Sequence, residues 1–218
     1  MSMKSLIPNN KIKFVSIFVI WLFHVSGVIG IGFANKDFFV SFTPINLLIS
    51  FYLLFANQIQ VNNNTIKTAF SIFFIGMFAE VLGVNYGYIF GEYVYLDNLG
   101  MKIMGVPLLI GIQWVIISFI TGSFAHYFFK NRRIKSICLG VFLMIFLDVL
   151  IEPVAPDLGF WVFESEVAPL QNYLGWFLIA IPAQIIFHFG VEKKELVFSI
   201  NLLIVNFLFF GILNLIAL

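Results

Sequence analysis

Residues 80–95 read EVLGVNYGYIFGEYVY, and residues 148–163 read DVLIEPVAPDLGFWVF. Each segment begins with a carboxylic acid and reaches a glycine eleven residues later. An aromatic-valine-aromatic run then follows in both. After loops of different length, both copies continue with Pro-Leu and place a tryptophan seven residues after the proline, Trp114 in the first and Trp176 in the second. The chain therefore carries one pattern twice.

The composition predicts a membrane protein. The chain has 218 residues, of which 61% are hydrophobic and only 11% are charged, too few to cover the surface of a soluble domain. Apolar runs close to the ~20 residues that cross a bilayer recur along its length. We expect one integral membrane domain over residues 1–218, an all-α bundle of transmembrane helices. The net charge of +1 gives no reason to expect nucleic acid as a partner.

Seven helices are expected, and basic residues set their orientation. With the N-terminus inside, ten of the twelve Lys and Arg residues lie on the inner side, and only Lys36 and Lys102 lie outside. The positive-inside rule then predicts N-in and C-out, in the cytoplasmic membrane of a bacterium. The connections at about 85–105 and 153–171 lie outside. The expected helices span about 12–33, 40–60, 68–84, 106–129, 135–152, 172–190 and 196–217.

The two copies run in the same direction, so they are expected to be parallel helical hairpins, at about 68–130 and 135–190. A third copy is an open alternative. His24-Val-Ser-Gly resembles the Glu80 segment, and Pro44 is followed by Phe51 as each later proline is followed by tryptophan.

The acids make the repeat a candidate site, because an ionisable side chain inside a bilayer costs at least ~2.5–3.5 kcal/mol. His24, Glu80 and Asp148 lie at similar distances from the inner ends of their helices, roughly 18–20 Å at ~1.5 Å per residue, and can form one layer. Glu152 lies one turn beyond Asp148 on the same face. Asn172 begins the sixth helix on the outer side.

A purely structural interpretation stays open for each of these residues. Buried acids pair across helices and fix packing, and a lone histidine often satisfies only a local hydrogen bond. Tyr93, Tyr95 and Trp161 also fit an interfacial aromatic belt.

The residues give no pattern for a metal or cofactor. The three histidines and one cysteine form no zinc motif, no glycine fingerprint follows a strand, and no aspartate pair suits Mg²⁺-diphosphate. What remains is carboxyl groups in apolar, aromatic surroundings, where the neutral acid is favoured. Such an acid can protonate an apolar alkene, and aromatic faces can stabilise the carbocation. We therefore expect no metal and no cofactor.

The sequence also resembles a known family, the carotenoid biosynthesis membrane proteins that include carotenoid hydratases of the bisanhydrobacterioruberin and γ-carotene type. The chain departs from the family pattern at Glu152-Pro153, where Asp-Pro is favoured, and at Val167-Ala168, where Gly-Val is favoured. The residues that carry the resemblance are Glu80-Val81-Leu82-Gly83, Gly87, Phe90-Gly91, Tyr93-Val94-Tyr95, Gly105-Val106-Pro107-Leu108, Asp148, Glu152-Pro153, Trp161 and Pro169 to Trp176.

The resemblance implies addition of water to the terminal C=C of an acyclic carotenoid. We expect Asp148 or Glu80 to donate the proton, and the other carboxylate or Glu152 to deprotonate the water. The expected substrate contacts are Tyr93, Tyr95, Trp161, Trp176, Asn172 and His24.

Two alternatives remain open. A carotenoid cyclase uses the same protonation step and closes a ring. A lipid-binding or proton-coupled transport protein uses intramembrane acids without catalysis. The expected partners are a carotenoid and the lipid bilayer, with other enzymes of the carotenoid pathway as further candidates.

Overall fold

The structure, a computed structural model, describes residues 10–130 and 132–216. Its helices are α1 (Lys11–Phe33), α2 (Lys36–Val40), α3 (Thr43–Ala56), α4 (Asn63–Tyr86), α5 (Leu108–Phe128), α6 (Arg133–Ile151), α7 (Leu170–Gly190) and α8 (Val197–Ile216). A 3-10 turn, η2 (Glu152–Val154), continues α6. Four short strands occupy the long connections: β1 (Tyr93–Tyr95), β2 (Lys102–Ile103), β3 (Val106–Pro107) and β4 (Trp161–Phe163).

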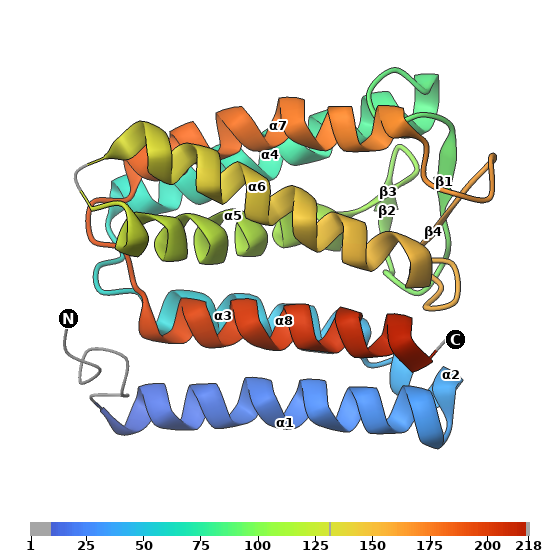
Figure 1. The fold of residues 1–218 in the computed structure, drawn as a ribbon, viewed down its shortest axis with the longest axis horizontal. Coiled ribbons are helices and arrows are strands. Elements are labelled where there is room, and N and C mark those ends of the chain that lie inside the picture. Colours follow the sequence, from blue (N-terminus) through green and yellow to red (C-terminus); the bar gives the residue numbers. More distant parts are fainter. Residues whose placement is uncertain (1–9, 131, 217–218) are drawn as a thin grey trace.

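The expected all-α membrane fold is confirmed. Seven segments of the described chain are long and apolar enough to cross a membrane, with α2 and α3 counted as one. Helix α1 begins and helix α8 ends at opposite ends of the bundle (Figure 1), as an odd number of spans requires. Outward-facing side chains such as Phe18, Phe74 and Phe142 are large, apolar and exposed, which suits contact with lipid.

Some helix boundaries differ from those expected, for reasons of capping. The second span begins at Lys36 and is interrupted by a turn after Val40. Helix α4 begins at Asn63 rather than 68, because the Asn62 side chain accepts a hydrogen bond from the Thr65 N–H at 2.9 Å and caps the helix. Glu80 therefore lies five residues farther from the helix start than expected. The last helix is described to Ile216, and residue 217 lies outside the described residues.

Helix α5 forms the centre of the bundle. In the most apolar 18 residues of α5, 72% of the residues are buried, whereas 17–44% are buried in the corresponding stretches of the other spans. It packs against α3, α4, α6, α7 and α8. Figure 1 shows α4, α5, α6 and α7 grouped together, with α3 and α8 beside them and α1 outermost.

The two copies of the repeated pattern pair directly with each other. Strand β1 of the first copy lies antiparallel to β4 of the second, with Tyr93 opposite Phe163, Val94 opposite Val162, and Tyr95 opposite Trp161. The register is symmetric about the two valines, which hold equivalent places in the repeat. Helices pair in the same way, since α4 packs on α7 and α5 packs on α6. The strands were not expected from the sequence.

The repeated glycine has a conformational cause. Gly91 and Gly159 have φ angles of +93° and +67°, where a side chain is disfavoured. Each turns the chain into the strand that follows, β1 or β4. The equal spacing from acid to glycine thus places equivalent turns in both copies.

Gly175 in α7 provides a test of close packing. A Cβ at this position would lie 2.5 Å from the Ile89 carbonyl oxygen and 2.8 Å from the Phe90 ring. Backbone cannot move aside as a flexible side chain can, so Gly175→Ala is expected to lower the free energy of unfolding by ~1–3 kcal/mol. Thermal unfolding in detergent measures this. Gly211→Ala in α8 is the control, since nothing lies within 4 Å of its Cβ; equal effects of both changes would contradict the argument.

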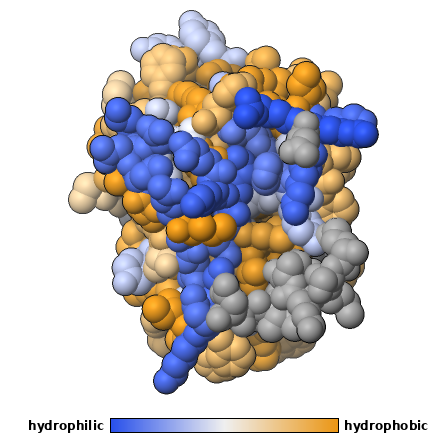
Figure 2. Space-filling model, turned by 90° about the vertical axis from the view of Figure 1, so that its left-hand side faces the viewer, coloured by the Kyte–Doolittle hydropathy of each residue, from blue (hydrophilic) through white to orange (hydrophobic). Residues whose placement is uncertain are grey.

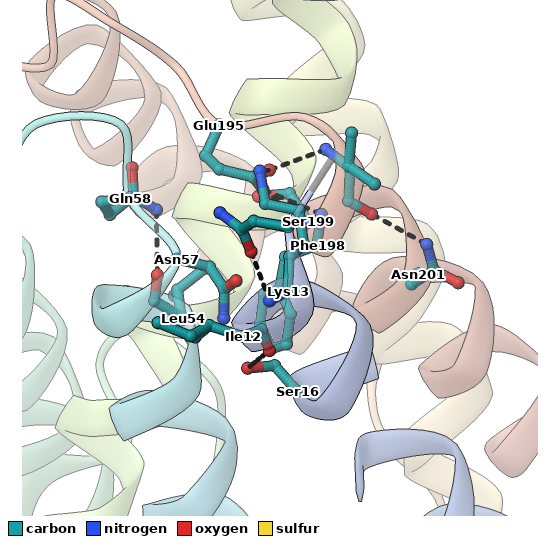
Figure 3. A network of polar contacts seen from close by, with 12 residues as sticks. Ile12, Lys13, Ser16, Leu54, Asn57, Gln58, Glu195, Phe198, Ser199 and Asn201 are labelled. Carbon is teal, nitrogen blue, oxygen red and sulfur yellow. Dashed lines mark hydrogen bonds and ion pairs between the residues drawn. The ribbon is translucent and has the colours of Figure 1, made fainter. Parts of the chain in front are cut away.

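A buried ion pair joins the first and last helices at the inner end of the bundle. The Lys13 Nζ lies 2.7 Å from the Glu195 Oε1, with side chains 11% and 1% exposed (Figure 3). Glu195 also accepts hydrogen bonds from the backbone N–H groups of Val197, Phe198 and Ser199. One carboxylate therefore caps α8 and holds α1 against it.

Candidate functional site

Glu80 is buried near the outer end of α4 and is held by three donors. Its Oε2 accepts hydrogen bonds from the Tyr93 hydroxyl at 2.5 Å and the Tyr95 hydroxyl at 2.7 Å. Its Oε1 accepts one from the Trp114 Nε1 at 3.0 Å. All three donors belong to the first copy of the repeat. A carboxylate is an acceptor only, so this set of donors suits the ionised form.

The two tyrosines are fixed as donors. Burial, followed by the charge of Glu80, raises the pKa of Tyr93 and of Tyr95 above the ordinary value of a phenol. Both hydroxyls therefore stay protonated at any physiological pH. The strand pairing of β1 with β4 sets the height of both rings above Glu80.

The second copy builds a different arrangement, a pair of acids bridged by an amide. The Asn172 Nδ2 donates to the Glu152 Oε1 at 2.8 Å and to the Asp148 Oδ2 at 3.1 Å. The Trp161 Nε1 donates to the Glu152 Oε2 at 3.0 Å. The two carboxyl groups thus share one amide donor, and the Asp148 Oδ1 has no hydrogen-bond partner among the described residues. Two carboxylates this close repel each other, and a proton on one of them relieves the repulsion.

A small cavity lies between the two sets of acids. Its volume is about 20 Å³, room for roughly one water molecule. Glu80 and Glu152 both line it, whereas Asp148 lies behind Glu152 and does not. The other lining residues are Phe90, Tyr93, Tyr95, Ile110, Gln113, Trp114, Trp161, Phe163, Asn172 and Trp176.

Aromatic rings form the walls of this cavity. Trp114 and Trp176, the equivalent tryptophans of the two copies, stack with ring centroids 4.2 Å apart and planes 18° apart. Tyr95 meets Trp161 edge-on at 5.8 Å. Several aromatic rings thus border the space where a cation would be stabilised.

His24 lies in a different cavity from the acids. Its Nδ1 lies 2.7 Å from the Ile20 carbonyl oxygen, and its ring contacts Phe209 edge-on. The cavity that it lines has a volume of about 60 Å³ and shares Gln113 with the acid cavity. On its other side, Asn46 and Phe209 also line a cavity of about 220 Å³. That third cavity reaches the exposed phenylalanines of α2 and the turn after it.

An outer cavity of about 570 Å³ lies on the other side of Tyr93 and Phe163. Glu92 and Glu164 line it, and the pKa of Glu92 is raised because it shares a hydrogen bond with Glu164 and the two carboxylates repel each other. The side chains of Tyr93 and Phe163, which line both cavities, therefore separate the outer cavity from the acid cavity.

Five residues that line the cavity were not among those expected from the sequence, and two of them, Gln113 and Trp114, have polar side-chain groups. Trp114 donates to Glu80, and its place in the repeat, equivalent to that of Trp176, was the available signal. Gln113 lines both the acid cavity and the cavity that contains His24. In the sequence it could have been noticed as an uncharged polar residue inside an apolar span. No group of three His, Cys, Asp or Glu side chains in the described parts of the chain is arranged to hold a metal ion.

Comparisons with known proteins identify the family. The family model for "Carotenoid biosynthesis protein" matches residues 42–218. A bisanhydrobacterioruberin hydratase from Haloarcula japonica is 28% identical over 130 residues, which cover 54% of this chain and 42% of the relative's own length. No solved structure matches the chain. Since the family model covers both copies of the repeat and most of the sequence, the chain belongs to the carotenoid biosynthesis protein family.

Proposed function

We propose that this protein is a carotenoid hydratase, which adds water to the terminal C=C of an acyclic carotenoid end group. The observation that carries the proposal is the cavity between Glu80 and Glu152, which is buried among membrane helices, walled by aromatic rings and large enough for water. The name of the Haloarcula relative supports hydration as the reaction. A substrate dissolved in the bilayer suits a site within the spans.

The proton donor in this proposal is the Asp148–Glu152 pair. A proton on one of the two relieves the repulsion between them, and Glu152 is the member that faces the cavity. Asn172 positions both acids by donating a hydrogen bond to each of them. Asp148 provides a second carboxyl group that can carry the proton. The repeat alone favoured Asp148 or Glu80 as the donor, and the cavity lining favours Glu152.

The reaction then balances between the two acids. Because the cavity alone has room for about one water molecule, the aromatic side chains around it must move apart when the end group enters. Glu152 gives its proton to the less substituted carbon of the alkene, which leaves a tertiary carbocation facing the aromatic walls. The oxygen of a water molecule bonds to that carbon. Glu80 receives the proton that the water loses, and a tertiary alcohol forms. Returning the proton from Glu80 to the acid pair completes the cycle without a change in net protonation.

The neighbouring cavities give the rest of the substrate a route from the lipid. The end group is proposed to pass Gln113, while the polyene lies along the cavities lined by His24 and Phe209. His24 then contacts the chain of the substrate rather than its reacting end. In this arrangement the carotenoid enters sideways from the bilayer, and the water comes from the outer cavity past Tyr93.

Expression in bacterial cells that make acyclic carotenoids tests the function. We expect pigments heavier by one water molecule for each end modified, measured by mass spectrometry. Pigments of unchanged mass and altered retention would indicate a cyclase instead. Unchanged pigments, with the protein present in the cytoplasmic membrane, would favour lipid binding or transport. Cells with a Glu80→Gln/Glu152→Gln double variant serve as the inactive control.

A further inference from the structure

A separate cavity lies at the inner end of the bundle, far from the acids along the spans. It has a volume of about 320 Å³ and forms where α5 ends, α6 begins and α7 ends. This is the end of the molecule that Figure 2 faces, where hydrophilic residues gather. The cavity is lined by His126, Phe129, Arg133, His188, Phe189, Val191, Glu192 and Lys194.

Two cationic side chains at this cavity form no ion pair with any described residue. The Arg133 guanidinium stacks on the Phe189 ring at 4.3 Å, which fixes its plane and leaves its N–H edges free for a ligand. The Lys194 Nζ donates to the Val191 carbonyl oxygen at 2.5 Å and keeps further donors. The ion pairs found among the described residues involve neither cation, and Glu192 is exposed at the rim.

A buried imidazole completes the set of donors. His188 is only 4% exposed, yet its Nε2 has no hydrogen-bond partner among the described residues. The ring of His126 lies 6.3 Å away, centroid to centroid. An imidazole nitrogen can donate to an anion, and a buried polar atom without a partner is costly. The ring lines the cavity, so a ligand bound there would lie beside it.

The surrounding charge also favours an anion. Burial, followed by the charge of Arg133, lowers the pKa of Lys194 to about 8, as expected where positive charges lack a counter-charge. The start of α6 has no side-chain cap, so its first N–H groups add to the positive potential. The ends of α5 and α7 bring carbonyl oxygens of opposite sign, and Lys194 already bonds to those of α7.

We propose that this cavity binds a phosphate group at the inner surface of the membrane, supplied by the headgroup of an anionic phospholipid. Two cations, two imidazoles and a free helix start match the charge and the acceptor oxygens of a phosphate. The lipid source follows from Phe189, a lining residue that is 64% exposed, and from Ile134, which follows the lining residue Arg133 in sequence and is 78% exposed. These side chains extend an apolar surface from the phosphate site toward the bilayer, where acyl chains can lie.

Purified full-length protein in neutral detergent tests this at about physiological ionic strength, which screens loose surface attraction. Binding of phosphatidylglycerol, phosphatidylcholine and inorganic phosphate is measured by native mass spectrometry and by the shift of the unfolding temperature. We expect phosphatidylglycerol to bind and raise the unfolding temperature, and the other two to have little effect at equal concentration. Arg133→Gln/Lys194→Gln is expected to weaken phosphatidylglycerol binding at least ~10-fold, about 1.4 kcal/mol.

The matched control is Arg132→Gln/Lys193→Gln, which removes the same charge at neighbouring positions outside the cavity. It should keep wild-type affinity. Arg133→Gln alone removes an exposed side chain and provides a second variant if the double variant unfolds. Equal losses in the cavity and control variants would overturn the proposal, as would no preference for phosphatidylglycerol over phosphatidylcholine. Protection by inorganic phosphate alone would overturn the lipid as the source.

Discussion

Glu152→Gln is expected to lower the rate of carotenoid hydration by roughly 10²–10⁴-fold, the usual contribution of a positioned general acid. Glutamine keeps the size of the side chain and can still accept from Asn172, but it has no acidic proton for the alkene. The measurement is the initial rate of hydrated pigment formed by membranes supplied with carotenoid. Because the substrate contacts remain, the loss should appear in kcat more than in KM.

Two further variants separate this role from a structural one. Asp148→Asn should also lower the rate, since Asp148 holds Glu152 and shares its proton; a near wild-type rate would remove Asp148 from the donor pair. Glu164→Gln, in the outer cavity, is the matched control and should retain activity. An enzyme with Glu152→Gln that hydrates carotenoid as fast as the wild type, at equal protein level, would exclude Glu152 as the donor.

The second large effect concerns stability. Glu195→Ala is expected to lower the free energy of unfolding by about 3–5 kcal/mol, because it leaves the Lys13 ammonium buried without its partner. It also removes the cap of α8. Lys13→Met should cost less, since the Glu195 carboxylate keeps its three backbone donors. Chemical or thermal unfolding in detergent, followed by circular dichroism, measures both changes.

The contrast for this experiment is an ion pair of similar length at the surface. The Lys36 Nζ lies 3.0 Å from the Asp157 Oδ1, with side chains 34% and 45% exposed. Asp157→Ala is therefore expected to change stability by less than about 1 kcal/mol. If this variant and Glu195→Ala lose similar stability, burial does not determine the strength of the inner pair.

Hydropathy and charge were sufficient to predict the spans, because the bilayer fixes helix length and basic residues mark the inner side. They were insufficient where hydrogen bonds determine at which residue a helix begins or which strands pair. Asn62 caps the start of α4 within a polar stretch, which hydropathy alone predicts to lie outside the membrane. The pairing of β1 with β4 depends on contacts 70 residues apart in sequence, from Tyr93 to Phe163, which no local pattern reveals.

The site was predicted in part for a geometric reason. Rise per residue gives the depth of a side chain, and depth predicted that acids from both copies lie in one region of the bundle; in the structure Glu80 and Glu152 line one cavity. The direction in which a side chain points depends on how each helix is rotated against its neighbours. That rotation turns Glu152 into the acid cavity, keeps Asp148 behind it and places His24 in the next cavity.

The symmetric register of β1 and β4 relates the two halves of the chain as two subunits are related. A two-fold dimer joins its subunits by contacts between equivalent residues, and Val94 opposite Val162 with Trp114 against Trp176 is an arrangement of that kind. The two halves of this chain are therefore joined as the subunits of a homodimer are. Because they belong to one chain, they can carry different residues at equivalent positions, which identical subunits cannot. Where the first half has Val84 and Ile110, the second has Glu152 and Asn172.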